Sequence, residues 1–387
     1  MTIKLFYENS RITEFTSEIV TTIFRDNKYH VVLKETAFYP EGGGQPSDTG
    51  EISGISVENV YEKDNIIYHI IDKPIDDKNI FGRVDYSKRF DYMQQHSGEH
   101  ILAAAFYKLF NANNVGFHMG EEYSTLDVSM AEISESHINL VENHANELIG
   151  LNIPIKCYIV NRSQLNSIPL RKKTSINNDI RIVEIENHDY SACCGIHVNT
   201  TSEVGLIKII RTEKYKGNLR VYFKCGNRAL DDYRSKHKTI TELTKLLSEE
   251  ECNILKRVIN QNNCIKEQQK KISDLKKQVF IFEANNIKSS LNSNIFRNVY
   301  EDKSLEELEQ ISKILNEDNI TTVLASKLCK KVFCGCNEFN ELNFGKIFKD
   351  NIGRFNGKGG GNKNSAHGSF TSEEDLLKFY GFLNDLL

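Results

Sequence analysis

The hydrophobic and polar positions over residues 1–87 follow the two-residue period of β-strands. Residues 41–50, with the sequence EGGGQPSDTG, give a strong turn signal in the middle of this region. Four segments alternate apolar with polar side chains or are rich in β-branched residues, namely 16–25, 28–35, 55–63 and 65–72. The pattern predicts a small antiparallel barrel or sandwich, and we expect an N-terminal β-barrel that carries the glycine-rich motif.

After residue 87 the period changes to that of an α-helix. Apolar positions at helical spacing run from residue 88 to about residue 110 and end in an Asn-rich stop. Residues 116–230 mix several strand-like segments with one further helix over residues 133–150. This α+β pattern predicts a second domain at 88–230.

Residues 231–290 have no proline and are rich in Lys, Glu and Gln. Apolar residues recur there at steps of three, four or seven: Leu247, Ile254, Val258, Ile265, Ile272, Leu275 and Val279. This heptad-like spacing, with polar interruptions at Gln261 and Gln268, is typical of coiled coils. Ser248 followed by Glu251 resembles a capping box. We therefore predict a helical linker with two helices joined near residue 248 as a coiled-coil-like hairpin.

The segment 291–387 contains two short apolar strands, helices between and after them, and the glycine-rich loop NGKGGGNKNSAHGS at 356–369. This alternation predicts a small C-terminal α/β domain. The whole chain is thus expected to be a multidomain α+β protein. Its predicted domains are 1–87, 88–230, 231–290 and 291–387.

The composition of the 387-residue chain is ordinary for a folded protein, with 39% hydrophobic and 26% charged residues. No segment approaches the roughly 18 consecutive apolar residues of a membrane span, and the N-terminus lacks the apolar core of a signal peptide. Nine cysteines are an odd number and do not suggest a disulfide framework. We expect a cytoplasmic protein with reduced thiols and no membrane partner.

The net charge of −4 is unevenly distributed. Residues 206–288 carry about 19 Lys and Arg against about 10 Asp and Glu. A basic segment of this kind binds phosphates in nucleic-acid-binding proteins, because each phosphate that it neutralises releases counterions. A solvated helix surface explains the same charge run, so both interpretations stay open.

Two pairs of residues suggest a metal site. His96 and His100 are four residues apart on the predicted helix, so both imidazoles lie on one face, one turn apart. Cys193 and His197 form a second pair about 93 residues later. One thiolate with three imidazoles is a zinc-type set of donors, and we expect one Zn²⁺ per chain. The donors alone are equally compatible with a closed structural site.

Two further motifs admit more than one interpretation. The segment from His96 to His100, with Glu99 inside it, formally matches the inverted zinc-protease motif. A protease would need a further carboxylate ligand and would leave Cys193 and His197 without a role, so we disfavour it. The run from Gly42 to Gln45 either offers backbone N–H groups to phosphate or carbonyl oxygens, or is simply a tight turn.

Six ordered segments of the chain resemble the AlaX family of free-standing alanyl-tRNA editing proteins, in its long form: 36–50, 91–106, 116–128, 168–173, 189–198 and 219–230. Residues 231–290 correspond to the helical linker of alanyl-tRNA synthetases. The glycine-rich loop resembles a segment of their C-terminal domain that is implicated in dimerisation and tRNA contact. Two departures stand out: Cys194 and Ile196 replace a Gly and a Thr of the family pattern, and Asn362–Ser365 replaces an expected Pro-Asp pair.

The resemblance implies a trans-editing hydrolase that removes serine or glycine from alanine tRNA by cleaving the ester at the 3′-terminal adenosine. The implied zinc ligands are His96, His100, Cys193 and His197, with Cys194 as a rival to Cys193, and a zinc-bound water or His118 is the candidate catalytic group. The implied substrate-binding residues are Thr36, Gly42, Gly43, Gly44, Gln45, His118 and Arg171, with Lys172 as a further phosphate contact.

Alanine tRNA carrying a non-cognate amino acid is the expected partner. A homodimer through 231–387 is a further candidate assembly. The alternative function is a non-catalytic tRNA-binding module whose zinc only stabilises the fold.

Overall fold

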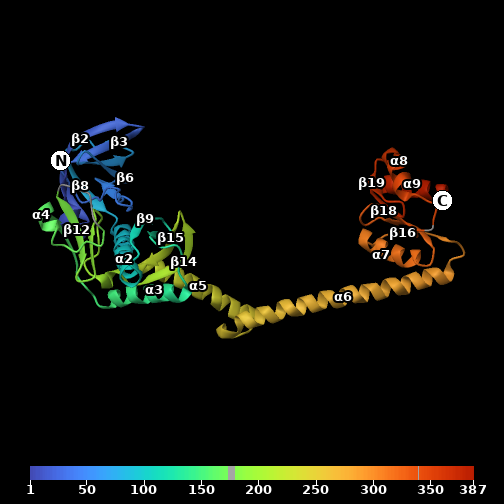
Figure 1. The fold of residues 1–387 in the computed structure, drawn as a ribbon. Helices are drawn as coiled ribbons and strands as arrows, with labels where there is room; N and C mark the ends of the chain where they lie inside the picture. Colours follow the sequence, from blue (N-terminus) through green and yellow to red (C-terminus); the bar gives the residue numbers. More distant parts are fainter. Residues whose placement is uncertain (173–178, 339) are drawn as a thin grey trace. The chain divides into compact units, whose positions relative to one another are not determined.

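The computed structural model describes residues 1–172, 179–338 and 340–387 and divides into two compact units, Met1–Leu243 and Thr244–Leu387 (Figure 1). Both units combine sheets with helices, which confirms the mixed α+β, multidomain class. Lys173, the last residue of the matched segment 168–173, lies outside the described residues. Within the described part of the chain, no helix has the length and apolar character needed to cross a membrane.

The first unit begins with six antiparallel strands that pair in a closed barrel of order β2-β3-β7-β6-β5-β8. These strands are β2 (Glu14–Arg25), β3 (Lys28–Leu33), β5 (Gly50–Ile52), β6 (Ile55–Lys63), β7 (Ile66–Ile71) and β8 (Asn79–Val84). Two of its hairpins turn at Asp26–Asn27 and Asp64–Asn65, where both residues have positive φ, as a two-residue turn of type I′ requires. Beside the barrel lie β1 (Ile3–Lys4), α1 (Leu5–Glu8) and β4 (Glu35–Thr36).

Helix α2 (Tyr86–Phe110) is the central element of the first unit (Figure 1). It begins at Asp85, whose side chain accepts a hydrogen bond from the Lys88 amide, and ends at Asn111 in the left-handed conformation. All residues from Tyr92 to Phe106 are buried. A helix buried on all sides in this way holds its polar residues rigidly in the interior, which suits a site built from them.

The rest of the first unit packs around α2 as two sheets and further short elements. One sheet has the order β14-β15-β10-β9, with β14 (Ile207–Tyr215), β15 (Asn218–Cys225), β10 (Ser124–Val128) and β9 (Asn114–Met119). The other has the order β11-β12-β13, with β11 (Ile155–Val160), β12 (Ile180–Ile185) and β13 (Asp189–Ala192). The helical elements are α3 (Glu135–Gly150), α4 (Arg162–Leu165) and η1 (Thr201–Val204).

One hydrophobic core extends from Phe6 to Cys225 and therefore crosses the predicted domain boundary at residue 87. A buried ion pair reinforces this junction, because the fully buried Arg89 of α2 donates to the carboxylate of Asp48. The same guanidinium also donates to the backbone carbonyls of Ser10 and Ile12. The barrel and α2 are thus packed as one body.

Two helices follow, α5 (Gly226–Leu247) and the 37-residue α6 (Ile254–Ser290), with the short η2 (Glu251–Asn253) between them. The predicted break near residue 248 is present, but the predicted capping box is wrong. Ser248 has φ +50° and follows the last residue of α5, while η2 begins at Glu251 and its N-cap residue, Glu250, makes no side-chain cap hydrogen bond. A left-handed residue ends a helix, so Ser248 acts as a C-terminal stop.

The C-terminal part of the second unit is a five-stranded sheet of order β16-β17-β18-β20-β19. Its strands are β16 (Ile295–Tyr300), β17 (Thr321–Ser326), β18 (Lys331–Gly335), β19 (Lys358–Gly361) and β20 (Ser365–Ser369). The accompanying helices are α7 (Leu305–Asn316), α8 (Phe344–Asn351), η3 (Ile352–Phe355) and α9 (Glu373–Leu386). The predicted glycine-rich loop is in fact largely the hairpin β19–β20, because Gly359 and Gly361 leave room for the close approach of the paired backbone.

Candidate metal centre

The structure brings His96, His100, Cys193 and His197 together, with one ligand atom of each lying within 4.8 Å of all the others. The two histidines of α2 contribute one side, and the segment after β13 contributes the cysteine and the third histidine. Cys193 Sγ lies 3.4 Å from His96 Nε2 and 3.5 Å from His197 Nε2. Two segments about 93 residues apart in sequence therefore form one compact cluster of soft and borderline donors.

A buried partner orients each of the three imidazoles through Nδ1. His96 Nδ1 lies 2.8 Å from Gln45 Oε1, and His197 Nδ1 lies 3.1 Å from Ser97 Oγ. His100 Nδ1 lies 3.3 Å from Asp189 Oδ2. Metal-ligating histidines usually engage an oxygen in this way through the ring nitrogen that is not bound to the metal. Every Nε2 is thereby left available for a shared ion.

The distances fit zinc. Zinc–sulfur and zinc–nitrogen bonds of about 2.3 and 2.0 Å in tetrahedral geometry place the sulfur and nitrogen ligand atoms about 3.5 Å apart. The observed separations from Cys193 Sγ are 3.4 and 3.5 Å. Little rearrangement is needed for these residues to close around an ion.

The ionisation of the cluster provides an anionic donor and a proton that a metal would displace. Burial opposes ionisation of Cys193, but the charges and hydrogen bonds of the three surrounding imidazoles outweigh it and hold the pKa of the thiol well below its ordinary value. Burial likewise opposes protonation of His100, yet the hydrogen bond to Asp189 and the Cys193 thiolate raise the pKa of His100 to about 10. Burial and the neighbouring His96 lower the pKa of His197 to about 3. The cluster thus supplies a thiolate at neutral pH.

Arg171 lies in the interior beside this cluster, and its side chain is only 7% exposed. Its Nε donates to Asp189 Oδ1 at 2.7 Å, and its Nη2 donates to Ser191 Oγ at 3.0 Å. Ser191 Oγ in turn donates to Asp189 Oδ2 at 2.8 Å. Arg171 therefore holds the Asp189 carboxylate in place, and this carboxylate orients His100. Sequence reasoning missed Asp189 and Ser191, although both lie in the matched segment 189–198.

The glycine run forms a tight turn next to the cluster. The backbone N–H groups of Gly42 and Gln45 each donate to the other residue's carbonyl, so neither is free to bind a substrate. Gly43 and Gly44, between them, have positive φ. The buried Gln45 side chain points into the centre, where Oε1 accepts from His96 and from the Ile196 amide. Gln45 Nε2 is buried and has no hydrogen-bond partner among the described residues.

Two predicted substrate residues lie away from the four ligands. The Thr36 hydroxyl is buried and bonds to His69 Nε2 at 2.8 Å and to the Phe38 amide. His118 is exposed on β9 and lines a separate hollow that contains none of the four ligands. Its neighbour Phe117, on the opposite face of the strand, stacks against the His96 ring at 5.3 Å.

The two rival residues of the motif are also placed. Cys194 is exposed and is not part of the cluster, whereas Cys193 is. Glu99 is buried, accepts a hydrogen bond from Asn114, and has its Oε2 3.8 Å from His100 Nε2. The thiolate therefore comes from Cys193, with Glu99 outside the four clustered ligands.

The ligand segment is held by residues that the sequence did not single out. Arg181 Nη1 donates to the carbonyls of Cys193 and Gly195, at 3.0 and 2.7 Å. The Tyr7 hydroxyl donates to the Cys194 carbonyl at 2.8 Å, and the Arg181 guanidinium lies over the Tyr7 ring. A Cβ at Gly195 would overlap the His96 ring, so only glycine fits there.

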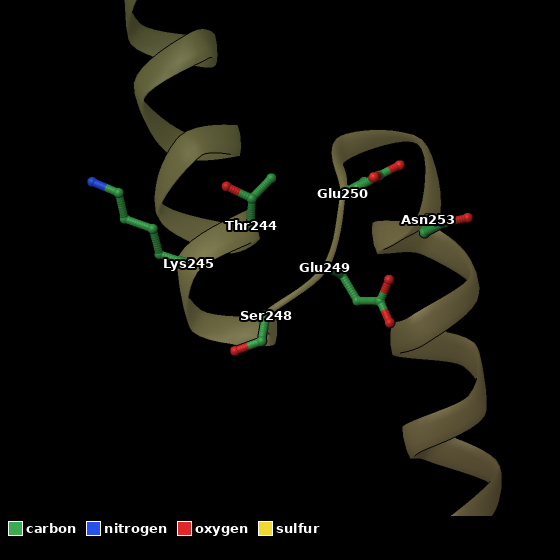
Figure 2. Close-up of a pocket in the computed structure, with 6 residues that line it drawn as sticks. All are labelled: Thr244, Lys245, Ser248, Glu249, Glu250 and Asn253. Carbon is green, nitrogen blue, oxygen red and sulfur yellow. The ribbon is translucent and has the colours of Figure 1, made fainter.

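The second unit has a polar recess of its own at the junction of α5 and α6, which Figure 2 shows. It is lined by Thr244, Lys245, Ser248, Glu249, Glu250 and Asn253. None of the residues predicted to bind metal or substrate lines this recess.

Comparison with known proteins shows similarity to tRNA synthetases and alanyl-tRNA editing proteins. Residues 180–222 match the model of the threonyl and alanyl tRNA synthetase second additional domain, and residues 4–85 match that of class II (A) tRNA synthetases. The alanyl-tRNA editing protein AlaX-L of Pyrococcus horikoshii is 30% identical, over 97% of this chain and 96% of its own length.

Two further relatives are longer. The alanine–tRNA ligase of Methanobrevibacter smithii is 27% identical over 99% of this chain but only 45% of its own length. The alanyl-tRNA editing protein Aarsd1 of Mus musculus is 31% identical over 68% of this chain and 65% of its own length. Because the similarity to the Pyrococcus protein extends over nearly the full length of both chains, this chain belongs to the AlaX-type family of alanyl-tRNA editing proteins.

Proposed function

We propose that this protein is a trans-editing hydrolase that deacylates alanine tRNA carrying serine or glycine. The observation that carries the proposal is the cluster of His96, His100, Cys193 and His197, with every imidazole oriented by a buried partner. The relatives named as alanyl-tRNA editing proteins support the substrate class. The bond cleaved is the ester between the amino acid and the ribose of the 3′-terminal adenosine.

The four clustered residues would hold one Zn²⁺, which when bound supplies a Lewis acid for the ester carbonyl. The surrounding side chains orient the residues that would bind the ion. Gln45, Ser97 and Asp189 keep the imidazoles in the orientation that binding requires. Arg181 and Tyr7 fix the backbone around Cys193. A site that is preorganised in this way needs little rearrangement at the moment of reaction.

Gln45 is our candidate for contact with the aminoacyl group. Its buried Nε2 has no partner among the described residues, and an unpaired buried donor is costly unless a ligand or a water satisfies it. The substrate carbonyl or the serine hydroxyl would accept this hydrogen bond. Gly44 packs against Phe117, so the glycine turn and that ring together would form a wall of the site.

Selectivity for serine over alanine must come from hydrogen bonding. Alanine is smaller than serine, so no pocket that admits serine excludes it by size. A site that hydrogen-bonds the serine hydroxyl leaves buried polar groups unpaired when alanine is bound. Glycine removal would need a different basis.

A second candidate function is a tRNA-binding module in which zinc only stabilises the fold. The observation in its favour is that four protein donors complete a tetrahedral set without a vacant position. In that case the loss of one ligand would unfold the domain. Loss of deacylation with the fold retained is the result expected of an editing site.

The decisive experiment compares hydrolysis of seryl-, glycyl- and alanyl-tRNA(Ala), with and without a chelator. We expect the first two to be cleaved much faster than the third and the chelator to stop cleavage. His100→Ala should abolish deacylation with near-native circular dichroism, while the matched surface variant His137→Ala, on α3, should behave as wild type. Equal rates on all three substrates, or cleavage of none, would refute the editing function.

We also propose roles for the remaining parts of the chain. The helical linker 231–290 and the domain 291–387 would bind tRNA or form a homodimer, as the exposed apolar residues of α6 suggest. We propose that the chain has four functional domains, at 1–87, 88–230, 231–290 and 291–387. All nine cysteines are free thiols, which supports a reducing, cytoplasmic location.

A further inference from the structure

The four-stranded sheet of the first unit has a face that the metal centre does not use. Strand register places Arg211, Tyr222, Thr125 and His118 side by side across β14, β15, β10 and β9. Two residues further along each strand, a second row contains Glu213, Arg220, Asp127 and Gly116. Because residues two apart on a strand share a face, both rows lie on the same side, which we call the outer sheet face.

The opposite side of the sheet faces the core. Leu126 and Val221, which alternate with the residues of the two rows, are fully buried, and Phe117 stacks on His96. Phe117 and His118 are neighbours on β9 with side chains on opposite faces. One strand therefore contributes both to the metal centre and to the outer sheet face.

Two arginines on the outer sheet face are held flat against tyrosine rings. The Arg211 guanidinium carbon lies 3.5 Å from the centre of the Tyr222 ring, and that of Arg220 lies 3.5 Å from the centre of the Tyr215 ring. Tyr123 packs edge-to-face on Tyr222 at 5.0 Å. The Tyr222 ring is buried beneath these groups, so the planar group that Arg211 and Tyr222 present to a ligand is the Arg211 guanidinium, whose side chain is 51% exposed.

Carboxylates fix the same groups in place. The Asp127 carboxylate accepts hydrogen bonds from Nε and Nη2 of Arg220, at 2.7 and 2.8 Å. Glu213 accepts from Arg211 at 2.7 Å and from the Tyr222 hydroxyl at 2.6 Å. The planar groups are therefore ordered before any ligand arrives, which lowers the entropy cost of binding.

A hollow of about 580 Å³ opens on this face, bounded by residues that include His118, Tyr123, Arg220 and Tyr222. Its volume lies within the range of about 300–1,000 Å³ that is common for small-molecule sites, and it is large enough for a nucleotide. Glu121 and Glu122 also line it. Their carboxylates repel a phosphate but accept hydrogen bonds from the amino groups of a base, so a base suits this hollow better than a phosphate does.

Basic residues lie along the β14–β15 hairpin beside the hollow, and most of them are paired. Residues 207–225 contain six Lys or Arg and one Glu, and five of the six form ion pairs with carboxylates: Lys208, Arg211, Lys214, Arg220 and Lys224. A paired lysine or arginine keeps further N–H groups that can donate to a phosphate. A basic track beside stacked planar groups is the usual arrangement for single-stranded nucleic acid, since the track follows the phosphates while bases stack. Bases within a duplex do not expose their faces, so an unpaired strand fits and a helix does not.

We propose that the outer sheet face binds the unpaired nucleotides that precede the 3′-terminal adenosine of tRNA, with one base in the hollow and the phosphates along the β14–β15 hairpin. This inference rests on the proposed function for the identity of the RNA. It adds an RNA-binding surface that contains none of the four metal ligands and gives His118 a role in contacting a nucleotide.

The test uses the full-length, zinc-loaded protein and two uncharged RNA hairpins, one with an unpaired 3′ end and one blunt. Fluorescence anisotropy measures the affinity for each. We expect wild type to prefer the unpaired end by about tenfold or more, as stacking of one base typically contributes. Arg211→Ala should remove most of this preference, and Arg211→Lys, which keeps the charge without the planar group, should remove a substantial part of it.

Lys214→Ala is the matched control. It removes the same charge from the same strand, but Lys214 is 72% exposed and alternates with the residues of the outer sheet face. This variant should keep the preference for the unpaired end. Equal affinity of wild type for both hairpins would overturn the inference. An equal loss of the preference for the unpaired end in Arg211→Ala and Lys214→Ala would also overturn it.

The outcome is separable from that of the proposed function, because the hairpins carry no amino acid. A protein that prefers the unpaired end through Arg211 but hydrolyses no aminoacyl ester would support the surface and refute the editing activity. A protein that deacylates seryl-tRNA yet shows no preference between the hairpins would refute the surface alone.

Discussion

At the scale of single residues, His100 is the ligand with the most acidic surroundings. The carboxylate of Asp189 lies beside its Nδ1, and that of Glu99 lies 3.8 Å from its Nε2. Arg171 and Ser191 hold Asp189 from the other side. This chain of contacts would make Asp189 a positioning residue for the proposed zinc, because Asp189 contacts the cluster only through His100.

We predict that Asp189→Asn weakens zinc binding by about 10–100-fold, the usual effect of removing a partner that orients a ligand. Asparagine keeps an oxygen that can accept from His100 but lacks the negative charge. Competition with a chelating dye measures the affinity. Asp231→Asn, which changes a 68% exposed carboxylate on α5, is the control and should bind zinc as wild type does. Unchanged affinity in Asp189→Asn would show that this carboxylate has no such role.

The raised pKa of His100 predicts a pH dependence of metal binding. The pKa is raised to about 10, so the metal-free protein carries a proton on this imidazole at neutral pH. Because the metal binds the neutral ring, zinc must displace that proton, and the affinity should rise by about tenfold per pH unit below pH 10. Calorimetry in buffers of different ionisation enthalpy counts the protons released. Absence of proton release at pH 8 would contradict this assignment.

The raised pKa of His100 also affects the stability of the metal-free protein, but this effect favours low pH, whereas metal binding favours high pH. A group whose pKa is higher in the folded than in the unfolded state stabilises the fold at low pH. The contribution of His100 is complete below its unfolded pKa of 6.5 and is lost as the pH rises through about 10. His197 contributes with the opposite sign, because its pKa is lowered to about 3 and its contribution to stability is lost as the pH falls below 6.5. The two shifts therefore offset each other in the apo fold under mildly acidic conditions, where protonation of His100 disfavours the metal.

At the scale of elements, α2 is the part that the sequence pattern predicted best. Its helical period begins within two residues of the observed start at Tyr86, and its polar residues are those of the site. The glycine-rich segment 356–369 was predicted less well, as a loop, because glycine breaks most local signals. Only the pairing of Gly359 and Gly361 with β20 shows that it is a strand.

The packing of α2 on β15 depends on a glycine. A Cβ at Gly98 would overlap the sulfur of the fully buried Cys225. We predict that Gly98→Ala destabilises the protein by about 1–2 kcal/mol, since overpacking of about 1–3 kcal/mol outweighs the roughly 1 kcal/mol gain in helix propensity. Urea denaturation measures the change.

Two variants control this prediction. A Cβ at Gly150, at the end of α3, would have no neighbour within 4 Å, so Gly150→Ala should be neutral or slightly stabilising. Adding Cys225→Ala to Gly98→Ala should restore part of the lost stability if the sulfur causes the clash. A Gly98→Ala protein as stable as wild type would show that β15 yields to the extra methyl group.

At the scale of the whole molecule, the two compact units differ in how their apolar residues are used. The first unit encloses its core around α2. In the second unit, α6 keeps a row of exposed apolar residues at heptad spacing, with Val258 37%, Ile265 51%, Ile272 55% and Val279 58% exposed. Such a row is the seam of a coiled coil when a second helix covers it.

If a second copy covers this row, as proposed for the homodimer, Ile265→Lys and Ile272→Lys together should convert the dimer to a monomer. The added charges would be buried against each other and would repel. Sedimentation velocity at micromolar concentration measures the assembly. Asn263→Lys adds the same charge on the opposite side of α6, is exposed, and should leave the dimer intact. A wild-type protein that sediments as a monomer at this concentration would exclude the seam.

The sequence by itself determined what local spacing can encode. The helical register that puts His96 above His100, the Cys193–His197 pair and the break near residue 248 all depend on neighbours a few residues apart. The six matched segments and their order along the chain were enough to identify the family that the full-length similarity then confirmed.

Tertiary structure alone decided the rest, because strand register and packing bring together residues that are far apart in sequence. It placed Cys193, and not Cys194, beside the three histidines and brought Gln45 to His96. It also turned Arg171 inward to Asp189 and placed His118 on the face of β9 opposite Phe117. These outcomes depend on how β9, β13 and the glycine turn meet α2, which no local pattern of hydrophobic and polar residues specifies.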